Sequence, residues 1–274
     1  MTDEERLRLN NILETSRDRD ALEAAAVALA ESDDPAGLAD LGRFLASGEA
    51  LARLDDLNSP SFKTSHLARV LQALEKHPSP SSAQLCLRLI HEPAFLADDD
   101  RKIHLLPALA AVRPMSETVV EVFRQTSAEG YYNLNVRLLV KNGSPNALAL
   151  FEDMIRDAGV PEERRADGLH AAVLPHRAEL LVLQTIDRLL SGQLEDKVAM
   201  GAIETVFDYR TREWFGPAKN PPTPPPWQSA SDDALRFVLA LADKVRALGL
   251  PAPLLEAVNN TAAEIREILA ARRA

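Results

Sequence analysis

The chain has 274 residues, of which 46% are hydrophobic and only 5% aromatic, with a formal net charge of −10 and a pI near 5.2. Proteins that bind DNA or RNA depend on a basic face, so the acidic balance, with no Lys/Arg run longer than a pair such as Arg272 and Arg273, argues against a nucleic-acid partner. The one cysteine, Cys86, excludes an internal disulfide and a cysteine-based zinc site.

The chain begins with a predicted helix over residues 2–16, in which a few leucines and an isoleucine recur at helical spacing among many charges. This pattern indicates an N-terminal cap, assigned to residues 1–19. Residues 21–30 and 38–45 then predict a first helix pair around the turn at Asp34-Pro35. Residues 48–61 predict an insertion that carries a short extra helix.

The same unit recurs from residue 62 to residue 190: an apolar helix, a tight polar turn, and a second apolar helix. When five turn positions are aligned, the residues six and nine positions later are apolar in every copy, which places one buried stripe on each second helix. The aligned positions are Pro35, Pro80, Pro114, Pro145 and Arg177; the stripe residues are Leu41, Phe44, Cys86, Leu89, Val120, Phe123, Phe151, Met154, Leu183 and Ile186. A spacing of 31 to 45 residues between the aligned positions is typical of a two-helix repeat.

Three of the turns place a capping residue directly before proline, at Asp34-Pro35, Ser79-Pro80 and Ser144-Pro145. An Asp or Ser oxygen accepts from free backbone N–H groups of the first turn, and proline at the first helical position has no N–H to leave unsatisfied. Each of these turns therefore predicts a capped helix start.

This pattern of proline turns and paired apolar stripes resembles HEAT repeats, in particular the short variety also found in phycobilisome lyase-type proteins. The resemblance covers about residues 21–250 and implies a scaffold that binds other macromolecules. We predict an all-α fold: a right-handed α-solenoid of about six antiparallel helix pairs with helical end caps, forming one domain over residues 1–274. A four-helix bundle is the competing all-α fold, but it does not require equivalent stripes at five stations.

The C-terminal part of the chain is also predicted to form a helix pair, but a proline-rich segment separates its two helices. Residues 193–209 and 231–248 predict another helix pair, and residues 251–274 predict a C-terminal cap helix. Between the members of the pair, the segment 211–229 holds six of the 18 prolines and both tryptophans, so it is predicted to be extended. One interpretation makes Trp214, Phe215 and Trp227 partner-binding residues of a recognition loop; the other packs the rings back onto the last repeats.

A second candidate binding group starts the helix near residue 131. Its members are Tyr131, Tyr132, Asn133, Asn135 and Arg137. Asn side chains on a solenoid face can hold an extended peptide backbone, whereas the alternative is a solvated helix start with half-buried tyrosines.

No catalytic, cofactor or metal site is predicted. The six histidines lack the His-x-x-x-His spacing of a helical metal site, and the single His91-Glu92 pair is predicted to lie at a helix end. Asp98, Asp99 and Asp100 lack the glycine and distal glutamate of a calcium loop and are assigned to helix capping.

The sequence therefore favours a non-catalytic protein- or peptide-binding scaffold that uses the concave solenoid face. The alternative is a phycobilin-lyase-like helper or enzyme that binds a tetrapyrrole in the same groove. No apolar run reaches 18 residues and no secretory signal is visible, so we expect a cytoplasmic protein that does not enter a membrane.

Overall fold

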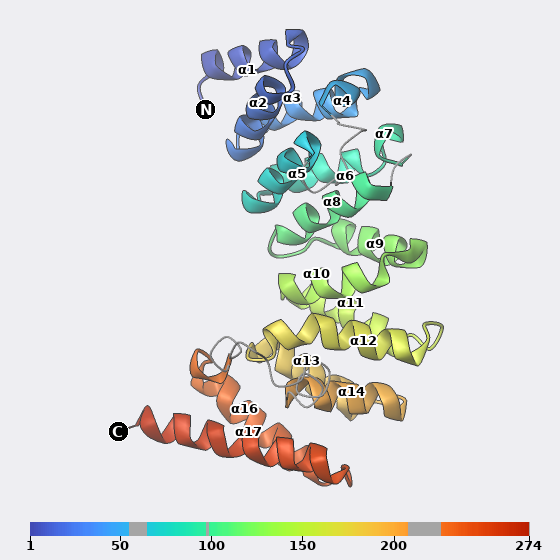
Figure 1. The fold of residues 1–274 in the computed structure, drawn as a ribbon, viewed down its shortest axis with the longest axis vertical. Coiled ribbons are helices and arrows are strands. Elements are labelled where there is room, and N and C mark those ends of the chain that lie inside the picture. Colours follow the sequence, from blue (N-terminus) through green and yellow to red (C-terminus); the bar gives the residue numbers. More distant parts are fainter. Residues whose placement is uncertain (55–64, 97–98, 208–225, 274) are drawn as a thin grey trace. The chain divides into compact units, whose positions relative to one another are not determined.

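The structure is a computed structural model that describes residues 1–54, 65–96, 99–207 and 226–273 (Figure 1). Within these residues all regular secondary structure is helical, which confirms the all-α prediction. Contacts divide the chain into two compact units, Met1–Phe123 and Arg124–Ala274. Each unit is described by itself, and the single domain stays a prediction.

The first unit is built from two layers of helices. Its helices are α1 (Asp3–Thr15), α2 (Arg19–Glu31), α3 (Pro35–Ala46), α4 (Gly48–Leu54), α5 (His66–Lys76), α6 (Pro80–Leu89), α7 (Pro93–Leu96), α8 (Asp99–Ala111) and the start of α9 (Glu117–Thr126). Helices α2, α5 and α8 contact one another in succession, α3 contacts α6, and α1 packs on both α2 and α3 (Figure 1). Helix α4 falls where the sequence predicts an extra helix.

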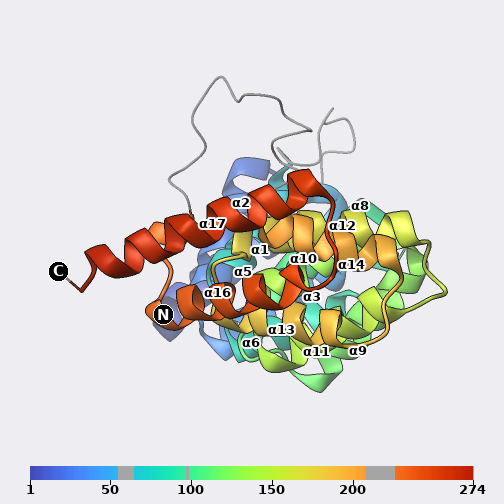
Figure 2. The ribbon, with the colours of Figure 1, turned by 90° about the horizontal axis from the view of Figure 1, so that it is seen from below.

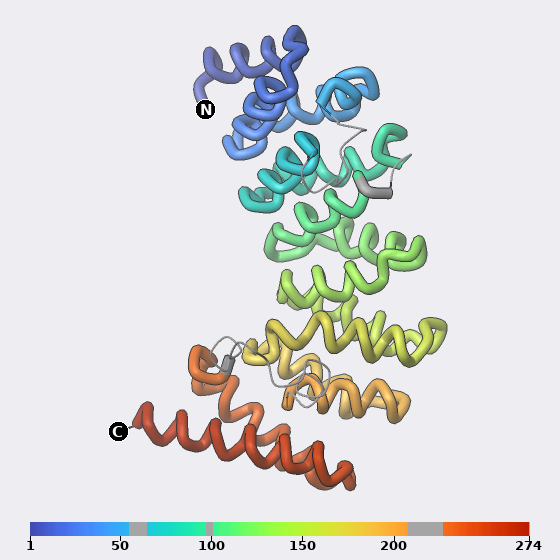
Figure 3. The backbone as a smooth tube through the Cα atoms, in the orientation of Figure 1, coloured from blue at the N-terminus to red at the C-terminus, as the bar shows by residue number. Residues whose placement is uncertain are grey.

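The second unit repeats this arrangement. Its elements are η2 (Ser127–Tyr131), α10 (Tyr132–Asn142), α11 (Pro145–Arg156), α12 (Glu162–Val173), η3 (Leu174–His176), α13 (Leu180–Ser191), α14 (Asp196–Val206), η4 (Pro226–Gln228), α16 (Asp232–Arg246) and α17 (Ala252–Ala271). One layer contains α10, α12 and α14, and the other contains α11, α13 and α16, as the backbone trace in Figure 3 shows. The long helix α17 lies beside α16 (Figure 2).

The second helices begin as the turn chemistry predicts in two of three cases. Asp34 Oδ1 accepts from the N–H of Ala36 at 3.1 Å, ahead of Pro35 at the first position of α3. Ser79 and Ser82 form a reciprocal capping box at the start of α6. The cap prediction is wrong for Ser144, whose hydroxyl makes no cap hydrogen bond and donates to Asn142 Oδ1 instead.

Two further second helices begin later than the alignment predicts. Helix α9 begins at Glu117, three residues after Pro114, and α13 begins at Leu180, three residues after Arg177. Even so, all ten predicted stripe residues are buried, the most exposed being Phe44 and Met154 at 7%. Burying a Leu or Phe side chain stabilises a fold by roughly 1.5–3 kcal/mol, so this stripe supplies a large part of the core.

Small residues let the first-layer helices of the second unit approach closely. A Cβ atom at Gly168 on α12 would stand 3.2 Å from Tyr132 Cε1 on α10, and one at Gly201 on α14 would stand 3.4 Å from Ala166 Cβ. These glycines cost helix propensity but permit the tight α10–α12–α14 layer.

One buried arginine joins three helices of that unit. The guanidinium of Arg165 donates to Val160 O at 2.9 Å, to Ile155 O at 3.1 Å, and to both oxygens of Glu195 at 2.7 and 2.8 Å. The carboxylate of Glu195 stands just before α14, and its hydrogen bond to Arg165 lowers its pKa to about 2. Arg165 therefore links the end of α11 to the starts of α12 and α14.

Candidate functional site

The polar group at the start of α10 divides into buried and exposed members. Tyr132 and Asn135 are 2% and 0% exposed. The Tyr132 hydroxyl donates to Met154 O at 3.1 Å, and burial raises the pKa of this phenol. Asn135 Nδ2 donates to Thr126 Oγ1 at 2.9 Å and to Ser127 Oγ at 2.8 Å. Both side chains hold α10 in place and neither reaches the surface.

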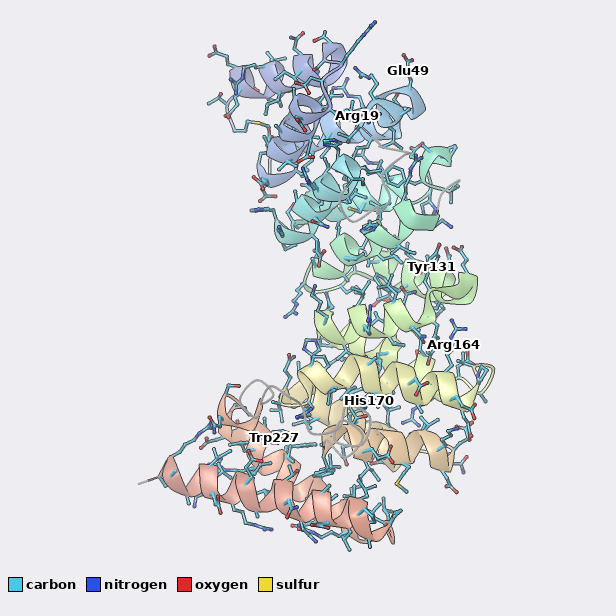
Figure 4. All side chains as sticks on the ribbon, viewed as in Figure 1. Arg19, Glu49, Tyr131, Arg164, His170 and Trp227 are labelled. Atoms are coloured by element: carbon cyan, nitrogen blue, oxygen red, sulfur yellow. The ribbon has the colours of Figure 1, made fainter. Side chains whose placement is uncertain are left out.

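The remaining members lie along an exposed edge of the second unit. Asn133 and Arg137 are exposed and Tyr131 is half-buried. Figure 4 shows Tyr131 and Arg164 at the same side of this unit. The Arg164 guanidinium lies 5.2 Å from the centre of the Tyr132 ring and donates to Gly130 O at 3.1 Å. This edge therefore offers polar groups to solvent.

Of the three aromatic residues predicted for the proline-rich segment, the structure places one. Trp227 in η4 is 3% exposed, and η4 contacts α17. Arg272 at the end of α17 donates to Gln228 O at 2.7 Å and fixes the backbone beside it. Trp214 and Phe215 lie outside the described residues. Trp227 therefore follows the interpretation in which the ring packs into the protein.

The first unit has a groove across α6, made of two adjoining clefts of about 240 and 490 Å³. Gln84 and Leu87 line both clefts. The first cleft is also lined by Pro80, Ala83, Leu109, Val112, Arg113, Pro114, Met115, Ser116 and Val119, and the second by Pro35, Ala39 and Arg88. We call this surface the α6 groove; it runs from the start of α3, across α6, to the start of α9.

The α6 groove differs in charge from the rest of the chain. Its lining contains two arginines, Arg88 and Arg113, and no carboxylate, although acidic residues outnumber basic ones by 41 to 31 in the whole sequence. The guanidinium of Arg88 lies against α3, since its Nη2 is 3.4 Å from where a Cβ at Gly42 would stand. In the part of the chain that the structure describes, no carboxylate pairs with Arg88.

A second, open cleft of about 540 Å³ lies between α1, α3 and α4, and we call it the α1 cleft. Three arginines and three carboxylates line it, so its charge is balanced. Its lining residues are Asn10, Leu13, Glu14, Thr15, Arg17, Asp40, Arg43, Phe44, Ser47, Glu49, Ala50 and Arg53. Figure 4 labels Glu49 on its α4 side.

Several charged groups of the α1 cleft already hold α1 in place. Asp40, only 5% exposed, accepts from Arg6 Nη1 at 2.8 Å and from Arg43. Arg53 donates to the backbone oxygens at the end of α1, including Leu13 O at 2.7 Å, and lies over the Phe44 ring. These contacts leave Arg17 and Glu49 as the charges of the cleft without a described partner.

Histidines and the cysteine lie apart from both surfaces. His66 Nδ1 lies 2.6 Å from Glu23 Oε2, which joins α5 to α2, and His170 Nδ1 lies 3.0 Å from Thr205 Oγ1, which joins α12 to α14 (Figure 4). Cys86 is fully buried, and burial raises the pKa of its thiol to about 12. Across residues 1–54, 65–96, 99–207 and 226–273, no group of three or more His, Cys, Asp or Glu side chains is arranged to hold a metal ion.

Sequence reasoning did not identify either cleft. The only available signal for the α6 groove was a second stripe on α6, formed by Pro80, Ala83 and Leu87 beside the buried one. Apolar residues at such positions are usually assigned to the edge of a core, because sequence alone does not show that the neighbouring helix leaves Pro80 and Leu87 partly uncovered.

Comparison with known proteins adds no family. No family model matches the chain, and no curated protein matches it. One solved structure, the crystal structure of an engineered protein, aligns over 98% of both chains with 15% identity and a TM-score of 0.29. A similarity at that level supports no argument about fold or function. None of the described helices is both long and apolar enough to cross a membrane.

Proposed function

We propose that the chain is a right-handed α-solenoid of about six antiparallel helix pairs and acts as a non-catalytic protein- or peptide-binding scaffold. Support for the solenoid comes from the recurrence of equivalent buried stripe residues on successive second helices and from the contacts between helices of the same layer within each unit. Units of this kind bury their apolar faces only by stacking on their neighbours.

The observation that carries the binding function is the α6 groove. Its two clefts share Gln84 and Leu87, so they form one continuous surface lined by α3, α6, α8 and α9. Half-buried Leu87 and Val112 and exposed Pro80 and Pro114 present apolar groups to solvent there. A concave surface with an apolar lining and a few polar groups is the usual form of a binding site, and a groove across helices fits a length of polypeptide.

Site-specific photo-crosslinking in a lysate of the native host tests this function. A photo-reactive residue at exposed Gln84 is expected to give discrete protein adducts, which the Leu87→Arg substitution removes by filling the groove. The matched control is the same residue at Lys76, which is exposed on α5 outside the groove. Equal adduct patterns from the two positions, or adducts at Gln84 that persist with Leu87→Arg, would refute a binding role for the groove.

Small-angle scattering tests the solenoid. A compact chain of this length has a radius of gyration of about 19 Å, and stacked helix pairs in an extended array are expected to exceed that value clearly. A measured value near 19 Å would rule out the extended array and return the chain to a compact helical bundle.

The alternative function is a bilin-binding helper, and the α1 cleft is the observation in its favour. Glu14 and Glu49 and the Phe44 ring give it the acidic and aromatic side chains that such a site needs. Titration with a free bilin, followed by absorbance, tests this: a red-shifted or intensified band that Glu49→Gln and Phe44→Leu weaken would support the alternative over the scaffold.

A further inference from the structure

We infer that the α6 groove binds an extended acidic segment of a partner protein, with one apolar side chain in its first cleft and a carboxylate against Arg88. This inference rests on the proposed scaffold function and specifies the chemistry of its partner. It depends on three properties of the groove: its charge, the position of Arg88, and the direction in which the clefts follow one another.

The positive charge of the α6 groove favours a partner segment with negative charge. Both ionised side chains that line the groove are arginines, in a chain whose formal charge is −10. Three acids adjoin lining residues along the chain, and none of them lines the clefts. Asp34 caps α3 by accepting from the N–H of Ala36, Asp40 is paired with Arg6 and Arg43, and Glu117 is in the first turn of α9. A carboxylate that enters the groove therefore meets positive charge locally, whereas most of the protein repels it.

The position of Arg88 gives the carboxylate a definite binding site. Glycine at position 42 leaves room for the guanidinium to lie across α3, between the two helices that flank the second cleft. No described carboxylate occupies it, and a planar guanidinium binds a carboxylate through two parallel hydrogen bonds. The amide of Gln84, exposed on the preceding turn of α6, can bond to a peptide group beside it.

The first cleft provides the apolar anchor. Its floor is buried Leu109, Met115 and Val119, and its rim is half-buried Leu87 and Val112. About 240 Å³ of space is sufficient for one large apolar side chain. A nucleic acid has no such side chain and would gain only two arginine contacts, which is few for phosphate-driven binding.

The direction of the groove indicates an extended segment. The clefts cross from α3 over α6 to the start of α9 and do not follow one helix. Packed helices lie about 8–10 Å apart, so two spacings amount to roughly 16–20 Å, which about six extended residues span.

Fluorescence anisotropy with labelled six-residue peptides tests the inference on the full chain at low salt. The probes are acetyl-EELEEL-amide, its basic counterpart acetyl-KKLKKL-amide, the leucine-free acetyl-EEGEEG-amide, and a single-stranded hexathymidine. We expect the acidic leucine peptide to bind, the leucine-free peptide to bind about tenfold more weakly, and the basic peptide and the oligonucleotide not to bind.

Charge reversal at Arg88 is the decisive variant. Arg88→Glu is expected to weaken the acidic leucine peptide about tenfold or more, because one charge-assisted pair is lost and a repulsion replaces it. Lys76→Glu makes the same change at an exposed, unpaired cation on α5 and is expected to stay within about twofold of the wild type. Both positions are exposed, so both variants fold, which circular dichroism verifies.

Each other outcome overturns the inference. It fails if no acidic peptide binds, if acidic and basic peptides bind equally, or if Arg88→Glu and Lys76→Glu have the same effect. Oligonucleotide binding that Arg88→Glu removes would assign the groove to nucleic acid. If Gln84 crosslinks to a partner while every acidic peptide fails, the scaffold function stands and only the acidic partner is wrong.

Discussion

The contact network of Arg165 makes its replacement by methionine the most informative test of the second unit. Methionine keeps an unbranched apolar stem of similar reach, so the change removes the guanidinium and leaves most of the packing. The substitution removes the hydrogen bonds that the guanidinium donates to Val160 O, Ile155 O and the Glu195 carboxylate. Arg165 itself is only 1% exposed.

The loss of unfolding free energy depends on which acceptors can replace the lost hydrogen bond with one to water. A hydrogen bond from a charged donor contributes about 1.5–3 kcal/mol, and the two carbonyl groups lose one such bond each. The side chain of Glu195 is 39% exposed and regains water, so its loss adds little. Because contributions in one network are not additive, we expect Arg165→Met to lower the free energy of unfolding by about 2–4 kcal/mol.

Urea denaturation followed by tryptophan fluorescence measures this change. Both tryptophans, Trp214 and Trp227, belong to the second unit by sequence, so the signal reports that unit. With a slope of about 2 kcal/mol per molar urea, the midpoint is expected to fall by about 1–2 M. Arg137→Met, at an exposed arginine on α10, is the control and is expected to stay within about 0.5 kcal/mol of the wild type. Equal midpoints for the two variants would refute this account of Arg165.

The pH dependence of stability provides an independent check of the same pair. Arg165 lowers the pKa of Glu195 from an ordinary 4.5 to about 2 in the folded protein. A depressed folded-state pKa means that the stabilisation is complete above pH 4.5 and is lost as the pH falls from there towards 2. Wild type is therefore expected to lose more stability over this range than Glu195→Gln, which has no carboxylate to protonate. Parallel curves for the two proteins would contradict the pairing.

Three further outcomes follow from burial and packing. Buried Cys86, whose thiol pKa is raised to about 12, is expected not to react with Ellman's reagent at pH 8 until urea unfolds the first unit; rapid labelling of the native protein would be inconsistent with its burial. Gly201→Ala, where the new Cβ lies 3.4 Å from its nearest neighbour, is expected to raise the free energy of unfolding by up to about 1 kcal/mol. Gly168→Ala has a closer contact of 3.2 Å and is expected to melt at a lower temperature than Gly201→Ala. The reverse order would show that α12 has room beside α10. Ser79→Ala is expected to lower the free energy of unfolding by about 1 kcal/mol, because it removes the capping box at the start of α6. Ser81→Ala, in the same turn but outside the capping box, is expected to leave stability unchanged, and thermal melts compare the two variants.

The helices and their buried stripe were predictable because both depend on local sequence. Apolar residues at helical spacing determine which face of a helix is buried wherever a neighbour is available, and all ten stripe positions are buried as predicted. Helix starts were predictable where capping was local, as at Asp34 and Ser79. At Ser144 the hydroxyl has a competing acceptor in Asn142, and the sequence gives no means of deciding between the two.

The candidate binding residues were harder to predict because polarity does not determine exposure. One interpretation placed Tyr132 and Asn135 at a binding surface, yet both are buried: the Tyr132 hydroxyl donates to Met154 O, and the Asn135 amide nitrogen donates to the Thr126 and Ser127 hydroxyls. Such partners come from other elements, or from the far side of the irregular turn at η2, and the sequence does not show which pairs meet.

The α6 groove forms where the repeat departs from its own rule. In α3, α6 and α11 the helix begins at the turn proline, so the turn residues after the proline belong to the helix. After Pro114 the helix begins three residues later, and Arg113, Pro114, Met115 and Ser116 stay outside any helix and line the first cleft. An irregularity that weakens the repeat as a sequence pattern thus leaves a helix side uncovered in the structure. The same reasoning predicts that deletion of residues 115–116, which would bring Pro114 directly before Glu117 as in the regular helix starts, closes the first cleft and removes acidic-peptide binding while the helical circular dichroism signal is retained.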